Sequence, residues 1–350
     1  MAVLCRLADP DNYVACPWDL IADQKGRDYW VGHFATHSET PLRLIRERLG
    51  LEADRRIDAF REEFNQLLKR IRNDPASFGE LTILTLDEHR EAMLRGHGFD
   101  DPYREVKRRE DDAAMRLYPR VIDELATHQG RELIELLIRG IFAGNIFDLG
   151  SMATIQAYEK NGLDFFATRS SQPPRPWLVD HFDALAERFA DGRSPYRKLL
   201  FFVDNAGADL ILGCLPLARQ IGLWGTDVVL AANSTPSLND ITAAELRQVL
   251  DQVCRIDPAV ADLVGRGRLT VVASGCGAPL IDLARVSDGC NLAARDVDLI
   301  ILEGMGRSVE SNFEARFGCD CLKICLLKDQ AVAERIGGTL FDVVCRFDSP

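Results

Sequence analysis

The sequence has no apolar run of roughly 18 residues or more, and no charged segment followed by an apolar core opens the chain. We therefore predict no membrane-spanning helix and no export signal, and we expect a cytoplasmic protein. The sequence also lacks a basic stripe with interleaved aromatic residues, and its net charge is -12. These features argue against non-specific nucleic-acid binding.

The ten cysteines include no Cys-x-x-Cys pair. We interpret them as buried free thiols in a reducing compartment rather than as a disulfide or metal framework. Histidine does not occur after His181. A metal site built from the second half of the chain would therefore have only Asp, Asn, Glu or Cys side chains as ligands.

The first part of the chain is predicted to be helical. Apolar residues recur at helical spacing between Ile57 and Ile71, and Asn73-Asp74-Pro75 ends that pattern. Thr40 and Pro41 suit a helix start, and Gly50 suits its end. We predict a mainly helical N-terminal domain over residues 1–190, with the proline-rich residues 170–176 as the best linker candidate.

Strand-like and helix-like segments alternate in the remainder of the chain, residues 191–350. We predict strands at 199–203, 227–232, 269–273, 299–302, 322–327 and 341–345, and helices at 210–220, 242–253, 279–286 and 330–336. Such alternation predicts an α/β fold with a Rossmann-like, mostly parallel sheet flanked by helices. Residues 191–350 would then form a metal- and phosphate-binding domain.

Polar side chains and glycines follow four of the predicted strands. Asp204 and Asn205 come after the first, and Asn233 and later Asp240 after the second. Ser274 follows the third strand, and Glu303-Gly304-Met305-Gly306-Arg307 closes the fourth. Because parallel strands end at the same edge of a sheet, these side chains are expected to converge there.

The convergence predicts a phosphate and metal site. Asp204, Asn205 and Asp240 would supply oxygen ligands for Mg²⁺ or Mn²⁺. Arg307 can bind a phosphate with both arms of its guanidinium group, and glycines let backbone N–H groups approach an anion. This grouping favours phosphoryl transfer to water, with Asp204 either binding the metal or attacking phosphorus itself.

Other residues leave alternatives open. Glu303 is either a simple ion-pair partner or a group beside the metal, such as a general base. Lys323 and Lys328 are more simply interpreted as solvated lysines than as a source of positive charge for the site. Residues 144–150, which interrupt an apolar helix, either end that helix or contribute Asn145 to the floor of the site.

The motifs Val203-Asp204-Asn205-Ala206-Gly207-Ala208-Asp209, Asn239-Asp240-Ile241-Thr242 and Glu303-Gly304-Met305-Gly306-Arg307 resemble the DUF89 family of damage-control phosphatases. The last motif resembles the signature of subfamily II, and the similarity extends to residues 139–150 and 174–177. Ala206 stands where the family often has Ser. That side chain is not expected to bind metal.

The resemblance implies a metal-dependent phosphatase for 4'-phosphopantetheine and its oxidised or damaged forms, limiting their entry into coenzyme A. The implied cofactor is Mn²⁺, Co²⁺, Ni²⁺ or Mg²⁺, held by Asp204, Asn205 and Asp240, and we expect no kinase domain within these 350 residues. Asp204, Glu303 and Arg307 are the catalytic candidates. The substrate-binding candidates are Asn145, Asn233, Ser274, Gly304, Met305, Gly306, Arg307 and Lys323.

Two other functions are compatible with parts of the pattern. A Rossmann-like sheet also suits an S-adenosylmethionine-dependent methyltransferase, although Asp204-Asn205-Ala206-Gly207 is a poor version of its glycine-rich turn. A phosphometabolite sensor without catalysis is the third reading. In the phosphatase reading the partner is a small-molecule phosphomonoester, and the sequence sets neither the oligomeric state nor the choice between phosphopantetheine and sugar phosphates.

Overall fold

The computed structural model describes residues 1–146 and 164–350. Its centre is a seven-stranded sheet in the order β1-β7-β6-β5-β2-β3-β4. All neighbouring strands are parallel except β6 and β7, which are antiparallel. The strands are β1 (Val179–Asp180), β2 (Lys198–Phe202), β3 (Asp227–Ala232), β4 (Leu269–Ala273), β5 (Leu299–Glu303), β6 (Asp320–Leu326) and β7 (Val343–Asp348).

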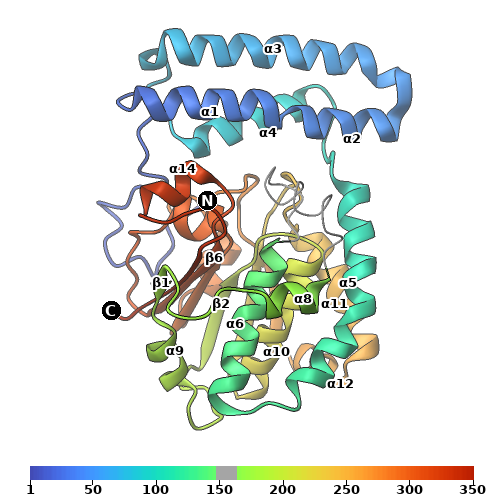
Figure 1. Ribbon diagram of the computed structural model, residues 1–350, viewed down its shortest axis with the longest axis vertical. Helices are drawn as coiled ribbons and strands as arrows, with labels where there is room; N and C mark the ends of the chain where they lie inside the picture. The colour runs from blue at the N-terminus through green and yellow to red at the C-terminus, as the bar shows by residue number, and fades with distance from the viewer. Residues whose placement is uncertain (147–163) are drawn as a thin grey trace.

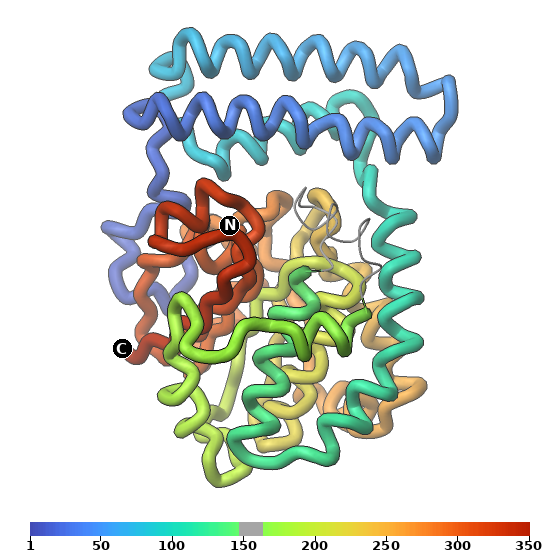
Figure 2. The backbone as a smooth tube through the Cα atoms, in the orientation of Figure 1, coloured from blue at the N-terminus to red at the C-terminus, as the bar shows by residue number. Residues whose placement is uncertain are grey.

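Helices surround this sheet and also form a layer of their own. The N-terminal layer contains α1 (Gln24–His37), α2 (Glu39–Leu49), η1 (Gly50–Ala53), α3 (Asp54–Asn73), η2 (Pro75–Phe78) and α4 (Ile83–Gly96). In Figure 1 this layer lies across one end of the molecule, and α5 (Arg104–Leu125) runs from it along the side of the sheet. Figure 2 shows the same path as a continuous tube.

The remaining helices connect the strands or lie next to them. They are α6 (Gly130–Ile146), α8 (Phe165–Ser170), α9 (Phe182–Arg188), the π-helical turn η3 (Asp209–Cys214), α10 (Leu215–Leu223), α11 (Ala243–Ile256), α12 (Pro258–Gly265), α13 (Asp288–Ala293), the π-helical turn η4 (Gly306–Glu310) and α14 (Gln330–Arg335). Within the described residues, no helix combines the length and the apolar character needed to cross a membrane.

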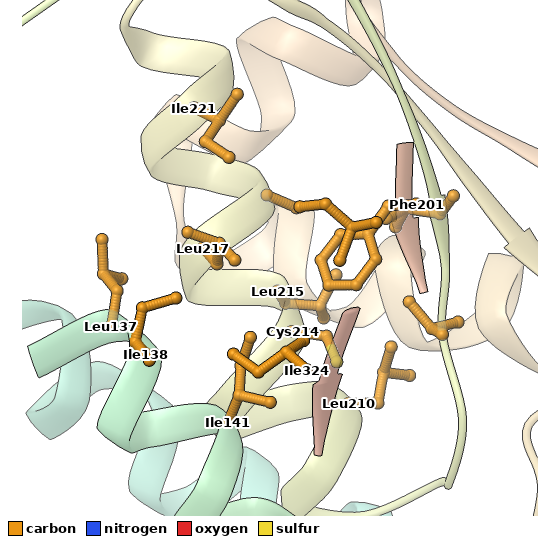
Figure 3. Packing of buried hydrophobic residues seen from close by; sticks show 14 of the residues in the cluster. Leu137, Ile138, Ile141, Phe201, Leu210, Cys214, Leu215, Leu217, Ile221 and Ile324 are labelled. Atoms are coloured by element: carbon orange, nitrogen blue, oxygen red, sulfur yellow. The ribbon is translucent and has the colours of Figure 1, made fainter. Parts of the chain in front are cut away.

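The sheet is buried on both faces, as β2 shows. Leu199 and Phe201 pack with the helices of one face, whereas Leu200 and Phe202 join a separate apolar cluster on the other. Figure 3 shows the first face, where Phe201 lies among side chains of α6, η3 and α10. Continuous apolar strands are typical of a parallel sheet covered on both sides.

A third apolar cluster joins the helical layer to the sheet. It combines residues of α1 to α4, such as Trp30, with Leu280, Val309 and Leu327, which follow strands of the sheet. The clusters therefore include residues from both sides of residue 190. The division of the chain into two domains at that residue stays a prediction.

The α/β fold with a mostly parallel sheet and an N-terminal helical part is confirmed. Each of the six predicted strands corresponds to an observed strand. The predicted helix at residues 279–286 is wrong, because that segment contains no helix and its backbone instead bonds to the N-terminal segment, as in the contact of Leu4 N with Leu283 O at 2.8 Å. The predicted helix start at Thr40 and Pro41 is one residue too late, because α2 begins at Glu39 and Ser38 is the residue that precedes it.

Candidate functional site

The acidic residues predicted after β2 and β3 meet at the carboxyl edge of the sheet. Beyond β2 the chain turns at Gly207, whose φ of 75° suits glycine, and then enters η3. The segment around Asp240 runs antiparallel beside this turn, because Ile241 N donates to Asp204 O at 3.0 Å and Ala206 N donates to Asn239 O at 3.0 Å. Asp240 is thereby held next to Asp204 and Asn205.

Arg307 joins the two carboxylates. Its guanidinium group forms one ion pair with Asp204 and another with Asp240, the latter with 2.8 Å between Nη2 and Oδ2. It also donates to Asn233 Oδ1 at 3.0 Å, and Asn233 donates in turn to Asp240 Oδ2 at 2.9 Å. All four side chains are buried, so the negative charges of the cluster are compensated by a fixed cation.

Two glycines of the Glu303 to Arg307 motif allow the close packing of this cluster. Gly304 has a φ of 91°, and a Cβ there would lie 2.7 Å from the Asp204 Cβ and closer still to its carboxylate. A Cβ at Gly306 would lie 2.6 Å from the Pro279 carbonyl oxygen. The motif therefore brings the backbone against Asp204, and Met305 between the two glycines lines a pocket.

Glu303 lies behind the cluster rather than in the pocket lining. It is fully buried, and its Oε2 accepts a hydrogen bond from the Asp204 backbone N–H at 2.9 Å. Asn145, also fully buried, donates to Glu303 Oε1 at 2.6 Å and to both carboxylate oxygens of Asp209 at 2.8 Å. Burial, together with the charge of Asp209, raises the pKa of Glu303 well above its usual value.

This arrangement gives Asn145 and Glu303 supporting positions. Asp209 accepts from the Asn205 side chain at 2.9 Å, so Asn145, Asp209 and Glu303 together hold the turn that carries Asp204 and Asn205. Asp209 was not among the predicted site residues, although it ends the Val203 to Asp209 motif. Of the residues predicted to form the floor of the site, 147–150 lie outside the described part of the chain.

The donor set of Asp204, Asn205 and Asp240 fits a divalent metal. All three side chains are buried and border the same pocket, and two of them are carboxylates, which pair with Arg307 in this structure. Hard cations prefer such oxygen ligands. Among the described residues Asp209, Cys214 and Glu303 also lie close enough to share an ion, but there Asn145 donates to both carboxyl groups and Cys214 donates to Glu303.

The pocket beside this cluster has a volume of about 330 Å³. Its lining combines Asp204, Asn205 and Asp240 with residues of α1 and α4 and with Lys328 and Asp329, which precede α14. Lys328 is buried, so its interpretation as a solvated lysine is wrong. The contribution of α1 was missed, although its aromatic and histidine residues recur at helical spacing.

Of the predicted substrate-binding residues, Met305 and Gly306 line the pocket, whereas Asn145, Asn233, Gly304 and Arg307 belong to its buried surroundings and are not in its lining. Lys323 and Ser274 lie elsewhere. Lys323 is fully buried in the middle of β6 and donates to the carbonyl oxygens of Phe313 and Ala315 at 2.7 and 2.6 Å, so it is neither solvated nor part of the pocket lining. Ser274 borders a different pocket, and its hydroxyl oxygen accepts from Cys276 N at 3.1 Å. Their predicted contact with substrate finds no support in this geometry.

Known proteins resemble this chain along nearly its whole length. The chain is 40% identical over 349 residues to a damage-control phosphatase of Arabidopsis thaliana, covering 97% of this chain and 94% of that protein. It is 40% identical to pantothenate kinase 2 of the same plant and 29% identical to a mouse 4'-phosphopantetheine phosphatase. The chain spans 42% and 48% of the lengths of those two proteins.

The fold also has a solved counterpart. A DUF89 family protein of Pyrococcus horikoshii superposes with a TM-score of 0.66 at 18% identity, over 90% of this chain and 96% of that one. These relatives lend no support to the methyltransferase alternative. The model of the damage-control phosphatase ARMT1-like domain matches residues 41–344, and the chain therefore belongs to that family.

Proposed function

We propose that this protein is a metal-dependent phosphatase that hydrolyses 4'-phosphopantetheine and its oxidised or damaged forms. The observation that carries the proposal is the meeting of Asp204, Asn205 and Asp240 at the border of one pocket, with the buried Arg307 paired to both carboxylates. The relatives named damage-control phosphatase and 4'-phosphopantetheine phosphatase support it. We further propose that the protein acts in the cytoplasm, in the control of damaged intermediates of coenzyme A metabolism.

Asp204, Asn205 and Asp240 would hold the cation, with Mn²⁺, Co²⁺, Ni²⁺ and Mg²⁺ as the candidates. When bound, such an ion supplies positive charge that draws electron density from the phosphoryl group. The protein itself adds Arg307, which Asn233 orients through a 3.0 Å hydrogen bond, and Lys328 in the pocket lining. Of the two, Lys328 lines the pocket and favours a phosphate group there, whereas Arg307 pairs with Asp204 and Asp240 next to it.

The reaction breaks the bond between phosphorus and the ester oxygen. Water supplies the new oxygen of the phosphate product, and the alcohol leaves with a proton. Arg307 compensates the charge of the phosphoryl oxygens as the bond breaks. Asp204 either orients the attacking water or attacks phosphorus directly, and in the second case water then hydrolyses the aspartyl phosphate to release phosphate and restore the carboxylate.

Phosphate release tests the proposal. Protein treated with a chelator and then supplied in turn with Mn²⁺, Co²⁺, Ni²⁺ or Mg²⁺ is expected to release phosphate from 4'-phosphopantetheine and from its oxidised form with at least one of them. Asp240→Asn should abolish the release, because it removes a carboxylate from the cluster. Asp251→Asn, the same substitution on the exposed face of α11, serves as the matched control. No phosphate release with any of the four metals would overturn the proposal.

A further inference from the structure

Two loops carry the predicted metal ligands, and helix α5 contacts the first of them directly. Asp204 and Asn205 lie on the loop after β2, and Asp240 lies on the loop after β3. Figure 1 shows α5 running from the helical layer along the side of the sheet. A Cβ added to Gly207, two residues after Asn205, would lie 2.8 Å from the Cβ of Glu110 on α5. The helix therefore packs closely against the first loop.

Asp111 of α5 bonds to this first loop. Its Oδ1 accepts a hydrogen bond from the backbone N–H of Gly207 at 2.7 Å in a partly buried position. A backbone donor that is removed from water needs such a partner. Because the chain turns at Gly207 from Asn205 into η3, Asp111 fixes the point at which the loop leaves the sheet edge.

Lys107, one turn earlier on α5, reaches the second loop through Glu245. The Lys107 side chain is buried, and its ammonium nitrogen lies 2.7 Å from Glu245 Oε1 and 3.3 Å from Asp101 Oδ2. The other carboxylate oxygen of Glu245 accepts from the Thr242 backbone N–H at 2.9 Å and from the Thr242 hydroxyl at 2.6 Å. Thr242 is the N-cap of α11 and follows Asp240 by two residues. One turn of α5 thus holds both loops.

Lys107 also compensates the charge of the acids around it. Burial raises the pKa of Asp111 to about 7, and the positive charge of Lys107 acts in the opposite direction. Removing one partner of a buried ion pair leaves the other charge without compensation. Without Lys107, Glu245, whose side chain is 27% exposed, would turn toward water and release Thr242.

We infer that Lys107 and Asp111 are positioning residues, which set the spacing between the two loops and thereby the affinity of the cluster for its metal. The inference rests on the proposed function, because the metal that Asp204, Asn205 and Asp240 would hold is part of that proposal. Neither Lys107 nor Asp111 lines the pocket beside the cluster, so neither is expected to touch substrate. Groups that hold metal ligands in place typically change metal affinity by about tenfold to 100-fold when they are removed.

The test is calorimetric titration of the full-length protein with Mn²⁺, without substrate. Asp240→Asn identifies the titrated site, because it removes one of the three predicted ligands and should abolish the binding. Lys107→Met should weaken Mn²⁺ binding by about tenfold or more. The direction of this change is diagnostic, since the loss of a nearby positive charge would by itself strengthen the binding of a cation.

Arg219→Met is the matched control for Lys107→Met. Arg219 pairs with the carboxylate of Asp257 at 2.6 Å, and Asp257 caps the start of α12 much as Glu245 supports the start of α11. This pair lies at the other end of α11 from Thr242. The control therefore also removes a cation from a capping carboxylate, and it should keep the wild-type affinity for Mn²⁺.

A second pair of variants tests the first loop and decides the inference if Lys107→Met does not fold. Asp111→Ala removes the acceptor of the Gly207 N–H and should weaken Mn²⁺ binding by about tenfold. Asp111→Asn keeps an oxygen acceptor in the same place and should retain most of the affinity. The difference between these two variants measures the hydrogen bond to the loop.

The outcomes separate the inference from the proposed function. Weaker Mn²⁺ binding in Lys107→Met and in Asp111→Ala, with wild-type affinity in Arg219→Met, supports the inference. Unchanged or stronger binding in Lys107→Met, an equal loss in Arg219→Met, or equal affinities of the two Asp111 variants overturns it, and phosphate release by the wild-type protein then leaves the phosphatase function in place. No phosphate release by the wild-type protein with any of the four metals overturns the proposed function, and the Mn²⁺ titrations still decide the inference.

Discussion

Replacing Gly304 by alanine is predicted to disable the acidic cluster while the fold survives. The residue has a φ of 91°, and an added Cβ would lie within 2.7 Å of the Asp204 Cβ and closer to its carboxylate. Asp204 would have to move by about 1 Å, and displacements of this size in catalytic groups cost about 100-fold in rate. The strained backbone would cost roughly 1 to 2 kcal/mol of stability in addition.

Gly337 provides a matched control for this substitution. Its φ is 79°, and an added Cβ there would meet no atom within 4 Å. Gly337→Ala therefore reproduces the backbone strain of Gly304→Ala without the collision. Urea unfolding should show a similar loss of stability in both variants, and phosphate release should fall about 100-fold in Gly304→Ala only. If Gly304→Ala retained full activity, the close approach of this backbone to Asp204 could not be needed for the reaction.

Three further predictions concern the surroundings of the cluster. Asn145→Leu removes the side chain that donates to the carboxyl groups of both Asp209 and Glu303. It should therefore lower the free energy of unfolding by about 3 kcal/mol in urea titrations. A loss below about 1 kcal/mol would contradict the supporting role of Asn145. Arg307→Lys keeps the charge but cannot reach both carboxylates and Asn233, so kcat/KM for phosphate release should fall at least tenfold, and an unchanged value would remove Arg307 from the mechanism. Burial raises the pKa of Asp87 to about 7, so its contribution to stability is complete below about pH 4 and is lost as the pH rises through 7. Asp87→Asn should reduce this loss of unfolding free energy by up to about 4 kcal/mol, measured by unfolding between about pH 4 and pH 7. An unaltered pH profile of stability would show that the Asp87 carboxyl group titrates normally.

The sheet and the acidic cluster could be predicted because their signals are local. Apolar runs of five or six residues with polar residues directly after them mark buried parallel strands and their ends. The rule that parallel strands end at one edge then places Asp204, Asn205 and Asp240 together without any knowledge of distances. In the structure all three border the same pocket.

The errors arise where tertiary contacts override local pattern. Residues 279–286 are apolar at near-helical spacing, yet Leu280, Ile281 and Leu283 are buried as an irregular segment. The backbone of this segment finds its partners in distant residues, since Tyr13 Oη accepts from Leu283 N at 3.0 Å. No window of the sequence contains that information.

Tertiary contacts also explain why the burial of the lysines was predicted wrongly. A lysine in a sequence is usually solvated, but Lys323 is fully buried because two carbonyl groups and Asp348 surround its ammonium group. The part of α1 that lines the pocket escaped prediction because its aromatic spacing is also that of an ordinary core helix. Its position at the pocket depends on how the helical layer packs against the sheet, which only the structure provides.

A crystal structure of the protein with Mn²⁺, using anomalous scattering to locate the ion, tests the central claim most directly. The account predicts an ion bound to oxygen atoms of Asp204, Asn205 and Asp240, at the distances of about 2.0 to 2.6 Å that hard cations make with oxygen. An ion seated instead among Asp209, Cys214 and Glu303, or an empty acidic cluster at saturating Mn²⁺, would contradict it.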